Sequence, residues 1–467
     1  MVAHSDMYDM IRFTLLPVFV SYMLIFLNIH PVHLQAQEAV AETAIEAADS
    51  SIVHQAKDDV DSLASEFFAG RGYVQDGHIK ASEYIKKRFL ASGLEPVHSR
   101  WFQPFDMPVN IIRDSYLVIN GDSLQPGVDY LPHATSGSGA AHHISDIHYA
   151  EQGLFIPSKE INQLPIYSAP GSMLIMDDYF PDSLNSYSKE MPTFFSNSYR
   201  IQVAQAIKAN SLIFLTPELT YGVPYFQNKI PVFDVLEYSW PLSLDTISYK
   251  IDAVFDTVTT RNVYAKIEGT VHPDSTIILS AHYDHFGLVS EGHHMSGAND
   301  NASGVAMLLA LADYFNQHPT SYTMLFVGFS GEEAGLKGSD YLFEHAPVDL
   351  DKTAFMLNFD MVASGEDGIV AVGGKTFPNY FNTLKKLADA SNKEALTLKA
   401  RENAPNSDQY RFLKRGIPGF YLYTNNGKQP YHHINDTPDT LEWDDFMNVF
   451  HLTRKFLESE FTRTIAN

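Results

Sequence analysis

The feature that most constrains the fold is the alternation of apolar runs with amphipathic segments from Thr259 to Asn467. Runs such as "STIILSAHYD" and "TMLFVGFSGEE" have the length and composition of buried strands, whereas "ASGVAMLLALADYFNQH" has the periodicity of a helix with one apolar face. Strands that alternate with helices form sheets that helices cover on both faces. We therefore expect residues 259–467 to fold as an α/β domain around a mixed, largely parallel sheet.

The residues before this domain differ in texture. Residues 58–100 contain apolar side chains at helical spacing that end at Gly93, so we expect a helix that packs on a larger body. Residues 101–258 instead consist of short strand-like runs that Gly, Pro, Asn and Asp interrupt. Within them "RIQVAQAIKANSLIFLTP" predicts a helix followed by a strand, and "NKIPVFDV" predicts another strand. We expect residues 101–258 to form a separate, mostly β module.

The N-terminus carries an apolar run from Phe13 to Ile29 that follows Arg12. Leu34-Gln35-Ala36 resembles a cleavage site, so we interpret residues 1–36 as a secretory signal peptide and expect a secreted or periplasmic protein without stable membrane insertion after cleavage. The alternative is an uncleaved membrane anchor, because the run has about the length that spans a bilayer. Three residues inside the run disfavour the anchor: Pro17, Ser21 and Asn28. Residues 37–57, rich in Ala and Glu, are expected to form a mobile leader.

Composition narrows the possible partners and metal sites. The 467-residue chain has a formal net charge of -24 and lacks the basic footprint that nucleic-acid binding requires. It contains no cysteine, which excludes disulfides and thiolate metal sites. Any metal must therefore be held by Asp, Glu or some of the 20 histidines.

Candidate metal ligands gather where the expected strands end. In open α/β sheets, functional groups lie beyond the carboxyl ends of the strands, because the chain turns outward there and leaves a crevice. Four strand-like runs carry such residues at their ends, namely His282 and Asp284, Glu332 and Glu333, Asp360, and His432. A fifth candidate, Asp300, lies on a Gly-rich turn before a long helix. Alone, Asp300 would be best explained as a helix N-cap, but the four strand ends favour a shared site.

The collected residue types suit a hydrolytic metal site. Two histidines and three carboxylates, with one further glutamate, are ligands that zinc, cobalt or manganese accept. Two metals about 3.5–4 Å apart, bridged by one carboxylate, can bind a water between them and lower its pKa. The remaining glutamate would then be the base that takes the proton of that water.

These motifs resemble those of a known family. "SAHYDH", "SGANDNASG", "SGEEAGLKGS", "NFDMV" and "YHHINDTPDT" are similar, in the same order, to the metal-site motifs of metallopeptidase family 28, the co-catalytic zinc aminopeptidases and their carboxypeptidase relatives. "SEFFAGR" to "FLASGLEP" and "NVYAKIEGT" resemble two further segments of the family. The likeness covers most of Val60–Arg100 and Asn262–Leu457. Residues 101–258 resemble the protease-associated insert of some members, which would form a lid that restricts substrate size.

The resemblance implies two zinc ions, for which cobalt or manganese could substitute. One zinc would be held by His282 and Asp360, the other by Glu333 and His432, and Asp300 would bridge the two. His432 is expected to be the ligand because the ligand histidine in the family lies four residues before the first Asp of a "DTPD"-like segment. Four other histidines are expected to be solvated or to lie one layer outside the ligands: His285, His293, His294 and His433.

Three further roles follow from the resemblance. Glu332 would be the general base, and Asp284 would orient His282, since metal-bound imidazoles usually need such a partner. Tyr431 would stabilise the tetrahedral oxyanion.

The stretch from Asn406 to Pro418 resembles a family segment that lines the substrate pocket. Gln409 stands where that segment often has a histidine, which leaves the preferred substrate side chain open. Ser407, Asp408 and Tyr410 are candidate pocket residues, although a Ser-Asp turn explains them equally well.

The leading activity implied by these motifs is that of an exported zinc aminopeptidase acting on peptides or proteins. A carboxypeptidase for acidic C-terminal residues is the nearest rival, and it would need basic groups to hold a free carboxylate. Two further candidates are a glutaminyl cyclase with a single zinc and a receptor-like protein that only binds partners. The sequence predicts neither the physiological substrate nor the oligomeric state.

Overall fold

The computed structural model describes residues 46–149, 170–177, 196–391, 396–427, 431–443 and 445–462. The predicted signal peptide, residues 1–36, lies outside this part of the chain. The described portion of the predicted leader, residues 46–57, is helical, and the helix continues to residue 63. Among the described helices, none combines the length and the hydropathy that crossing a bilayer requires.

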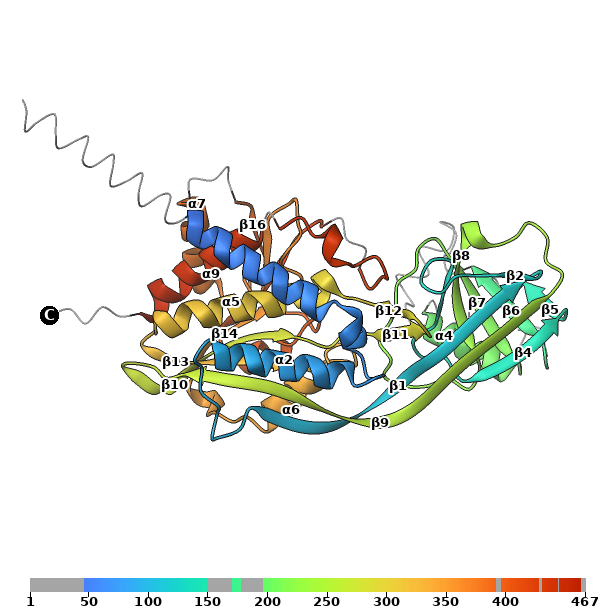
Figure 1. The fold of residues 1–467 in the computed structure, drawn as a ribbon, viewed down its shortest axis with the longest axis horizontal. Helices are drawn as coiled ribbons and strands as arrows, with labels where there is room; N and C mark the ends of the chain where they lie inside the picture. The colour runs from blue at the N-terminus through green and yellow to red at the C-terminus, as the bar shows by residue number, and fades with distance from the viewer. Residues whose placement is uncertain are drawn as a thin grey trace, which may run out of the picture. The chain divides into compact units, whose positions relative to one another are not determined.

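A ten-stranded mixed sheet forms the centre of the α/β part (Figure 1). Its order is β16-β15-β17-β14-β10-β13-β9-β1-β2, and β4 pairs with β9. Strands β10, β13, β14 and β17 are mutually parallel, whereas β9 is antiparallel to β13 and β15 is antiparallel to β17. The bounds are β1 (Phe102–Ile119), β2 (Asp122–Ser123), β4 (Gly139–Ile144), β9 (Ile247–Ile267), β10 (His272–His282), β13 (Tyr322–Phe329), β14 (Thr353–Phe359), β15 (Ile369–Val372), β16 (Leu398–Arg401) and β17 (Gly419–Thr424).

Helices cover both faces of this sheet, because successive side chains of a strand point to opposite faces. On one face, Phe326 of β13 packs against Phe89 of α2, with ring centroids 6.3 Å apart. On the other face, Leu325 belongs to a buried cluster that includes residues of α6 and α8. The helices are α2 (Gly77–Ala91), α5 (Gly304–Gln317), α6 (Lys337–Glu344), α7 (Pro378–Asp389), α8 (Tyr410–Arg415) and α9 (Phe446–Phe461). The predicted α/β fold with a mixed, largely parallel sheet is confirmed.

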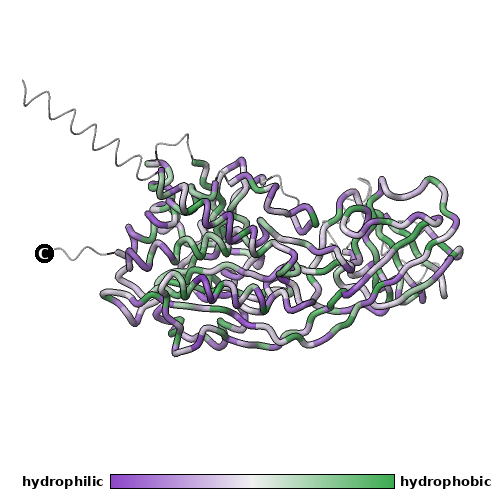
Figure 2. Tube along the Cα trace, viewed as in Figure 1, coloured by the Kyte–Doolittle hydropathy of each residue, from purple (hydrophilic) through white to green (hydrophobic). Residues whose placement is uncertain are grey.

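Part of the segment from 101 to 258 forms a second sheet of five strands, ordered β3-β8-β7-β6-β5. Helix α4 (Asn197–Ala206) packs on it through Ile201 and Ala204, and hydrophobic residues recur along the strands of both sheets in Figure 2. The bounds are β3 (Tyr130–Pro132), β5 (Ile147–Tyr149), β6 (Met173–Asp177), β7 (Ser211–Thr216) and β8 (Val232–Leu236). The helix and strand expected in "RIQVAQAIKANSLIFLTP" are α4 and β7.

Strands β1 and β9 belong to the main sheet and pair with each other from Phe102 to Ile119. The expected module boundary at Val258 falls inside β9, where the strand continues without a break. The division into residues 58–100, 101–258 and 259–467 therefore stays a prediction. A small hairpin of β11 (Gly287–Ser290) and β12 (His293–Met295) follows β10, and its residues Val289 and Met295 share a buried cluster with the second sheet.

Candidate metal centre

The expected ligands come together at one edge of the main sheet. His282 ends β10, Glu333 follows β13, Asp360 follows β14, and His432 follows β17. These four strands are parallel, so their carboxyl ends lie at the same edge. β10 lies between β13 and β14, so successive strands are added on opposite sides of β10. Such a switch point leaves a crevice at the carboxyl ends of the strands. Asp300 reaches the same place from η7 (Ala298–Ser303), an irregular turn directly before α5.

Asp300 lies between the two histidines. Its Oδ1 is 3.4 Å from Nε2 of His282, and its Oδ2 is 3.2 Å from Nε2 of His432. Asp360 Oδ1 is 3.4 Å from Nε2 of His282, and Glu333 Oε2 is 3.4 Å from Nε2 of His432. Each side of Asp300 therefore carries one imidazole nitrogen and one further carboxylate.

This donor set fits divalent metal ions. His282, Asp300 and Asp360 offer ligand atoms that all lie within 4.8 Å of one another, and so do His282, Glu332 and Glu333. Imidazole nitrogens and carboxylate oxygens without thiolates suit catalytic zinc. The five expected ligands are brought together, while their function as ligands stays a prediction.

Burial and neighbouring charges shift the pKa values of three carboxyl groups of the site in different directions. Burial raises the pKa of Glu333 well above its ordinary value, and the nearby Asp300 and Glu332 raise it further. Burial likewise raises the pKa of Glu332 well above its ordinary value, although His282 counteracts part of the effect. Burial also disfavours ionisation of Asp300, but hydrogen bonds from His282 and His432 outweigh it, so the pKa of Asp300 lies well below its usual range. Carboxylates this crowded favour the binding of cations, which neutralise their repulsion.

Asp284 supports the site through two hydrogen bonds. Its carboxylate accepts a hydrogen bond of 2.7 Å from the Tyr73 hydroxyl and one of 3.2 Å from the backbone N–H of Glu332. Nδ1 of His282 lies 3.2 Å from the backbone oxygen of Asp284 and 4.0 Å from its carboxylate. The nearer acceptor for His282 is thus the main chain of Asp284, and the carboxylate itself holds Glu332. The expected orienting role of the Asp284 carboxylate stays a prediction.

A chain of hydrogen bonds holds Asp360. Ser407 Oγ donates to Asp360 Oδ2 over 2.8 Å, and Asn358 Nδ2 donates to Ser407 Oγ over 2.8 Å. Ser280 in turn donates to Asn358 Oδ1 over 2.7 Å. All of these groups are buried, so few competing partners can reach them. Ser407, a candidate pocket residue in the sequence, here orients an expected ligand.

Two residues that the sequence left unassigned hold the turn of Asp300. The carboxylate of Asp436 accepts hydrogen bonds from the backbone N–H groups of Asn299 and Asp300, at 2.8 and 2.9 Å. Arg71 is fully buried, and its guanidinium donates to five backbone carbonyls: Leu63, Tyr283, Ser296, Gly297 and Asp300. Both residues lie in stretches that resemble the family, Arg71 at the end of "SEFFAGR" and Asp436 in "YHHINDTPDT", but neither stretch predicts which groups these side chains contact.

Among the four histidines expected outside the ligand set, His285 has the surroundings that differ most from those of a solvated residue. It is fully buried, and its Nδ1 lies 2.7 Å from Glu333 Oε1. Burial lowers the pKa of His285 well below its ordinary value, so the neutral ring donates this hydrogen bond. His285, Asp300 and Glu333 also offer ligand atoms within 4.8 Å of one another, which makes His285 an alternative ligand beside His432.

Two tyrosines lie near the ligands in different settings. The Tyr431 side chain is 54% exposed, and its ring stacks on that of His432 with centroids 3.5 Å apart. Tyr421, on β17, is buried, and burial together with the charge of Asp360 raises its pKa well above the ordinary value. The expected oxyanion role of Tyr431 stays a prediction, and Tyr421 is a site residue that the sequence did not single out.

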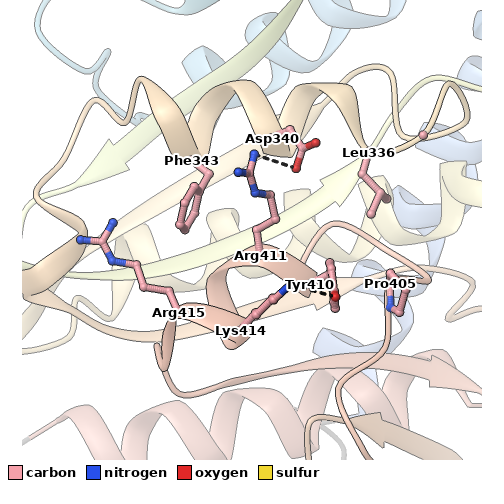
Figure 3. A pocket seen from close by; sticks show the side chains of 9 residues that line it. Leu336, Asp340, Phe343, Pro405, Tyr410, Arg411, Lys414 and Arg415 are labelled. Atoms are coloured by element: carbon pink, nitrogen blue, oxygen red, sulfur yellow. Dashed lines mark hydrogen bonds and ion pairs between the residues drawn. The ribbon is translucent and has the colours of Figure 1, made fainter.

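Two cavities lie near these elements. The first, of about 20 Å³, reaches Glu333 and is otherwise mostly apolar, with lining residues Tyr73, Val74, Asn110, Ile111, Ile112, Tyr221, Pro224, Phe286 and Leu288. The second is a surface pocket of about 500 Å³ between α6 and α8, which contains none of the expected ligands. Figure 3 shows the Arg411 guanidinium of this pocket directed at Asp340, and Arg415 pairs with Asp351 outside it. Two of its three cations are therefore already engaged by carboxylates.

Comparison with known proteins agrees with this arrangement. Aminopeptidase Y of Saccharomyces cerevisiae is 29% identical over 245 residues, which are 49% of this chain and 43% of that protein. The probable leucine aminopeptidase 2 of Aspergillus oryzae is 30% identical over 182 residues, 37% of this chain and 35% of that protein. The matched segments thus span less than half the length of these curated relatives.

Solved structures show the same fold. BSAP, a zinc aminopeptidase from Bacillus subtilis, superposes with a TM-score of 0.65 at 17% identity, over 89% of this chain and 96% of that chain. A peptidase M28 precursor from Shewanella amazonensis gives a TM-score of 0.64 at 17% identity, over 88% of this chain and 95% of that chain. Residues 262–457 match the model of peptidase family M28, and this segment contains every expected metal ligand. The similarity of this chain to peptidase family M28 thus rests on residues 262–457.

Proposed function

We propose that this protein is a zinc-dependent aminopeptidase that hydrolyses N-terminal peptide bonds with two zinc ions. The observation that carries the proposal is the position of Asp300, whose two oxygens face His282 and His432 at 3.4 and 3.2 Å. A carboxylate between two ligand groups of the same kind is the arrangement that a two-metal hydrolase needs. The names of the relatives, aminopeptidase Y and a probable leucine aminopeptidase, support the same activity.

In this proposal each residue of the site has one task. His282 and Asp360 would hold one zinc, Glu333 and His432 would hold the other, and Asp300 would serve both. When bound, the zinc ions supply an activated water and polarise the scissile carbonyl.

The chain's own acid and base groups then move the proton. Glu332 accepts a proton from the water as its oxygen adds to the carbonyl carbon, and it returns that proton to the leaving amine nitrogen when the C–N bond breaks. Asp284 holds the main chain of Glu332 at 3.2 Å, which keeps the base beside the ligands. The Tyr431 hydroxyl donates to the oxyanion as it forms.

The charges around the site favour an aminopeptidase over a carboxypeptidase. A free amine is held by carboxylates, and beyond the expected ligands and the base Glu332 the site contains the buried carboxyl of Asp408. A free carboxylate would need a cation, but Arg71 is fully buried and its guanidinium already donates to five backbone carbonyls. A single-zinc cyclase is disfavoured because ligand groups lie on both sides of Asp300, and a receptor without metal is disfavoured for the same reason.

The apolar cavity beside Glu333 gives the proposal a substrate preference. Its volume of about 20 Å³ holds about one water molecule, or a group of similar size such as a methyl. We therefore assign a preference for small apolar N-terminal residues. Export through cleavage after residue 36, and a lid function for the segment 101–258, also belong to the proposal; N-terminal sequencing of the exported protein tests the first.

The activity is tested with aminoacyl-nitroanilides and their N-blocked counterparts on zinc-loaded protein. We expect hydrolysis of alanyl substrates in preference to lysyl substrates and no hydrolysis after N-blocking. Glu332→Gln is expected to retain both zinc ions while kcat falls by about 10²–10⁴-fold. Turnover of C-terminal instead of N-terminal residues, or near-normal kcat in Glu332→Gln, would contradict the proposal.

A further inference from the structure

Two hydrogen bonds join His432 to the loop between β7 and β8, residues 217–231, which belongs to the second sheet. The backbone N–H of Tyr221 donates to the backbone oxygen of His432 over 3.0 Å. In the other direction, Nδ1 of His432 lies 2.8 Å from the backbone oxygen of Tyr221. A carbonyl can only accept, so Nδ1 carries a proton, and Nε2 is the ring atom that faces the carboxylates and would bind a metal.

The main chain of His432 needs such support. Its φ is +52°, in the left-handed region that side chains with a Cβ rarely adopt. A strained conformation persists when the surroundings over-determine it, and the two bonds to Tyr221 do so from both the ring and the backbone. Nε2 of the same ring lies 3.2 Å from Asp300 and 3.4 Å from Glu333.

Packing reinforces these bonds. The Phe286 ring packs on both partners, with centroids 5.0 Å from the Tyr221 ring and 4.5 Å from the His432 ring. The loop is tied to β1 as well, because the backbone N–H of Asn110 donates to Pro224 O over 2.8 Å and Gln227 Nε2 donates to Asn110 Oδ1 over 2.8 Å. The loop is thus held at both the main sheet and the ligand.

We propose that the β7–β8 loop is a positioning element of the metal centre, in which the Tyr221 backbone fixes both the ring and the main chain of the ligand His432. The second sheet then takes part in building the site and is more than a cover for it. A displacement of the loop releases His432 first and leaves the pair His282 and Asp360 in place. The inference rests on the proposed function, since it takes His432 as a zinc ligand.

The decisive experiment measures zinc stoichiometry and affinity by competition with a chromogenic chelator. Tyr221→Pro removes the backbone N–H that donates to the backbone oxygen of His432. We expect the zinc ion proposed at Glu333 and His432 to bind about 10- to 100-fold more weakly. Tyr225→Pro is the matched control, because it introduces a proline into the same loop at a position that is 51% exposed. The affinities for both zinc ions should stay within about twofold of wild type. Tyr221→Phe keeps the backbone and the ring and serves as a second control.

The outcomes separate the two proposals. A wild-type protein that binds fewer than two zinc ions contradicts the proposed function. A wild type with two zinc ions and a folded Tyr221→Pro variant with unchanged affinities overturns only the role of the loop.

Proton NMR of wild-type protein labelled with ¹⁵N-histidine keeps the inference testable if Tyr221→Pro does not fold. The His432 signal, assigned by its loss in His432→Gln, should show a slowly exchanging proton on Nδ1. A proton on Nε2 instead would refute the bond to Tyr221.

Discussion

Replacing Arg71 by lysine tests whether a buried guanidinium holds the turn that carries Asp300. Burial lowers the pKa of Arg71 to about 10, which still leaves it protonated at neutral pH. The five carbonyls that it binds come from the end of the first helix, from the segment after β10 and from the turn of Asp300. Lysine retains the charge but has only three donors, in a geometry without the planar fork of arginine.

The expected loss follows from the number of bonds. At least two of the five carbonyls lose their donor in Arg71→Lys, and a hydrogen bond to a charged group contributes about 1.5–3 kcal/mol. We therefore expect the free energy of unfolding to fall by about 3 kcal/mol or more in urea denaturation. Zinc affinity should fall as well, because Gly297 and Asp300 belong to the turn that presents a proposed ligand. Arg71→Met removes the cation altogether and is expected to fold poorly.

Arg411→Lys is the matched control for this experiment. Arg411 is 35% exposed and pairs with Asp340 and Glu344 at the surface, where such pairs contribute little. The free energy of unfolding of the Arg411→Lys variant should differ from that of the wild type by less than about 0.5 kcal/mol. If Arg71→Lys matches Arg411→Lys in both stability and zinc content, the reasoning about the five-carbonyl clamp is wrong.

Three further predictions concern the metal centre. Chelation of zinc should lower the melting temperature and abolish activity, and added zinc should restore both. The reason is that a ligand at about 1,000 times its Kd stabilises the folded state by about 4 kcal/mol. A melting temperature that does not respond to the chelator would contradict this prediction. Ser407→Ala removes the donor to Asp360 Oδ2 and should weaken zinc binding about 10- to 100-fold, whereas Ser459→Ala on α9, which loses only a bond to Phe456 O, should bind zinc normally. His285→Leu removes the donor to Glu333 Oε1 and should weaken binding of the zinc proposed at Glu333 and His432 by a similar factor, and His285→Gln should restore part of that affinity. Equal zinc affinity in the wild type and both variants would show that His285 does not hold Glu333.

Local patterns predicted the parts of the molecule that depend on short stretches of chain. The runs ending in His282, Glu333 and Asp360 have the composition of buried strands because parallel strands covered on both faces need apolar side chains throughout. β10, β13 and β14 are indeed buried along most of their lengths. The helix α2 ends two residues before Gly93, in agreement with the spacing of Ile85 and Phe89.

Contacts between residues far apart in the chain could not be predicted from the sequence. His285 was expected to be solvated or peripheral, yet it is buried against Glu333, 48 residues away. Arg71 contacts carbonyls more than 200 residues further along the chain, and Tyr221 contacts His432 across 211 residues. No spacing rule links such pairs, because their proximity depends on how the sheets and loops pack.

The sequence by itself determined the α/β class, the four strands that end near the candidate ligands (β10, β13, β14 and β17) and the order of the motifs that carry His282, Asp300, Glu333, Asp360 and His432. Those features follow from hydrophobic periodicity and from the tendency of functional groups to gather at the ends of parallel strands. Only the tertiary structure decided which groups surround these residues: Arg71 and Asp436 at the turn of Asp300, Ser407 at Asp360, His285 at Glu333 and Tyr221 at His432. The physical reason is that a buried polar group must find a hydrogen-bond partner, and the partner is whichever donor or acceptor the packing brings within about 3 Å.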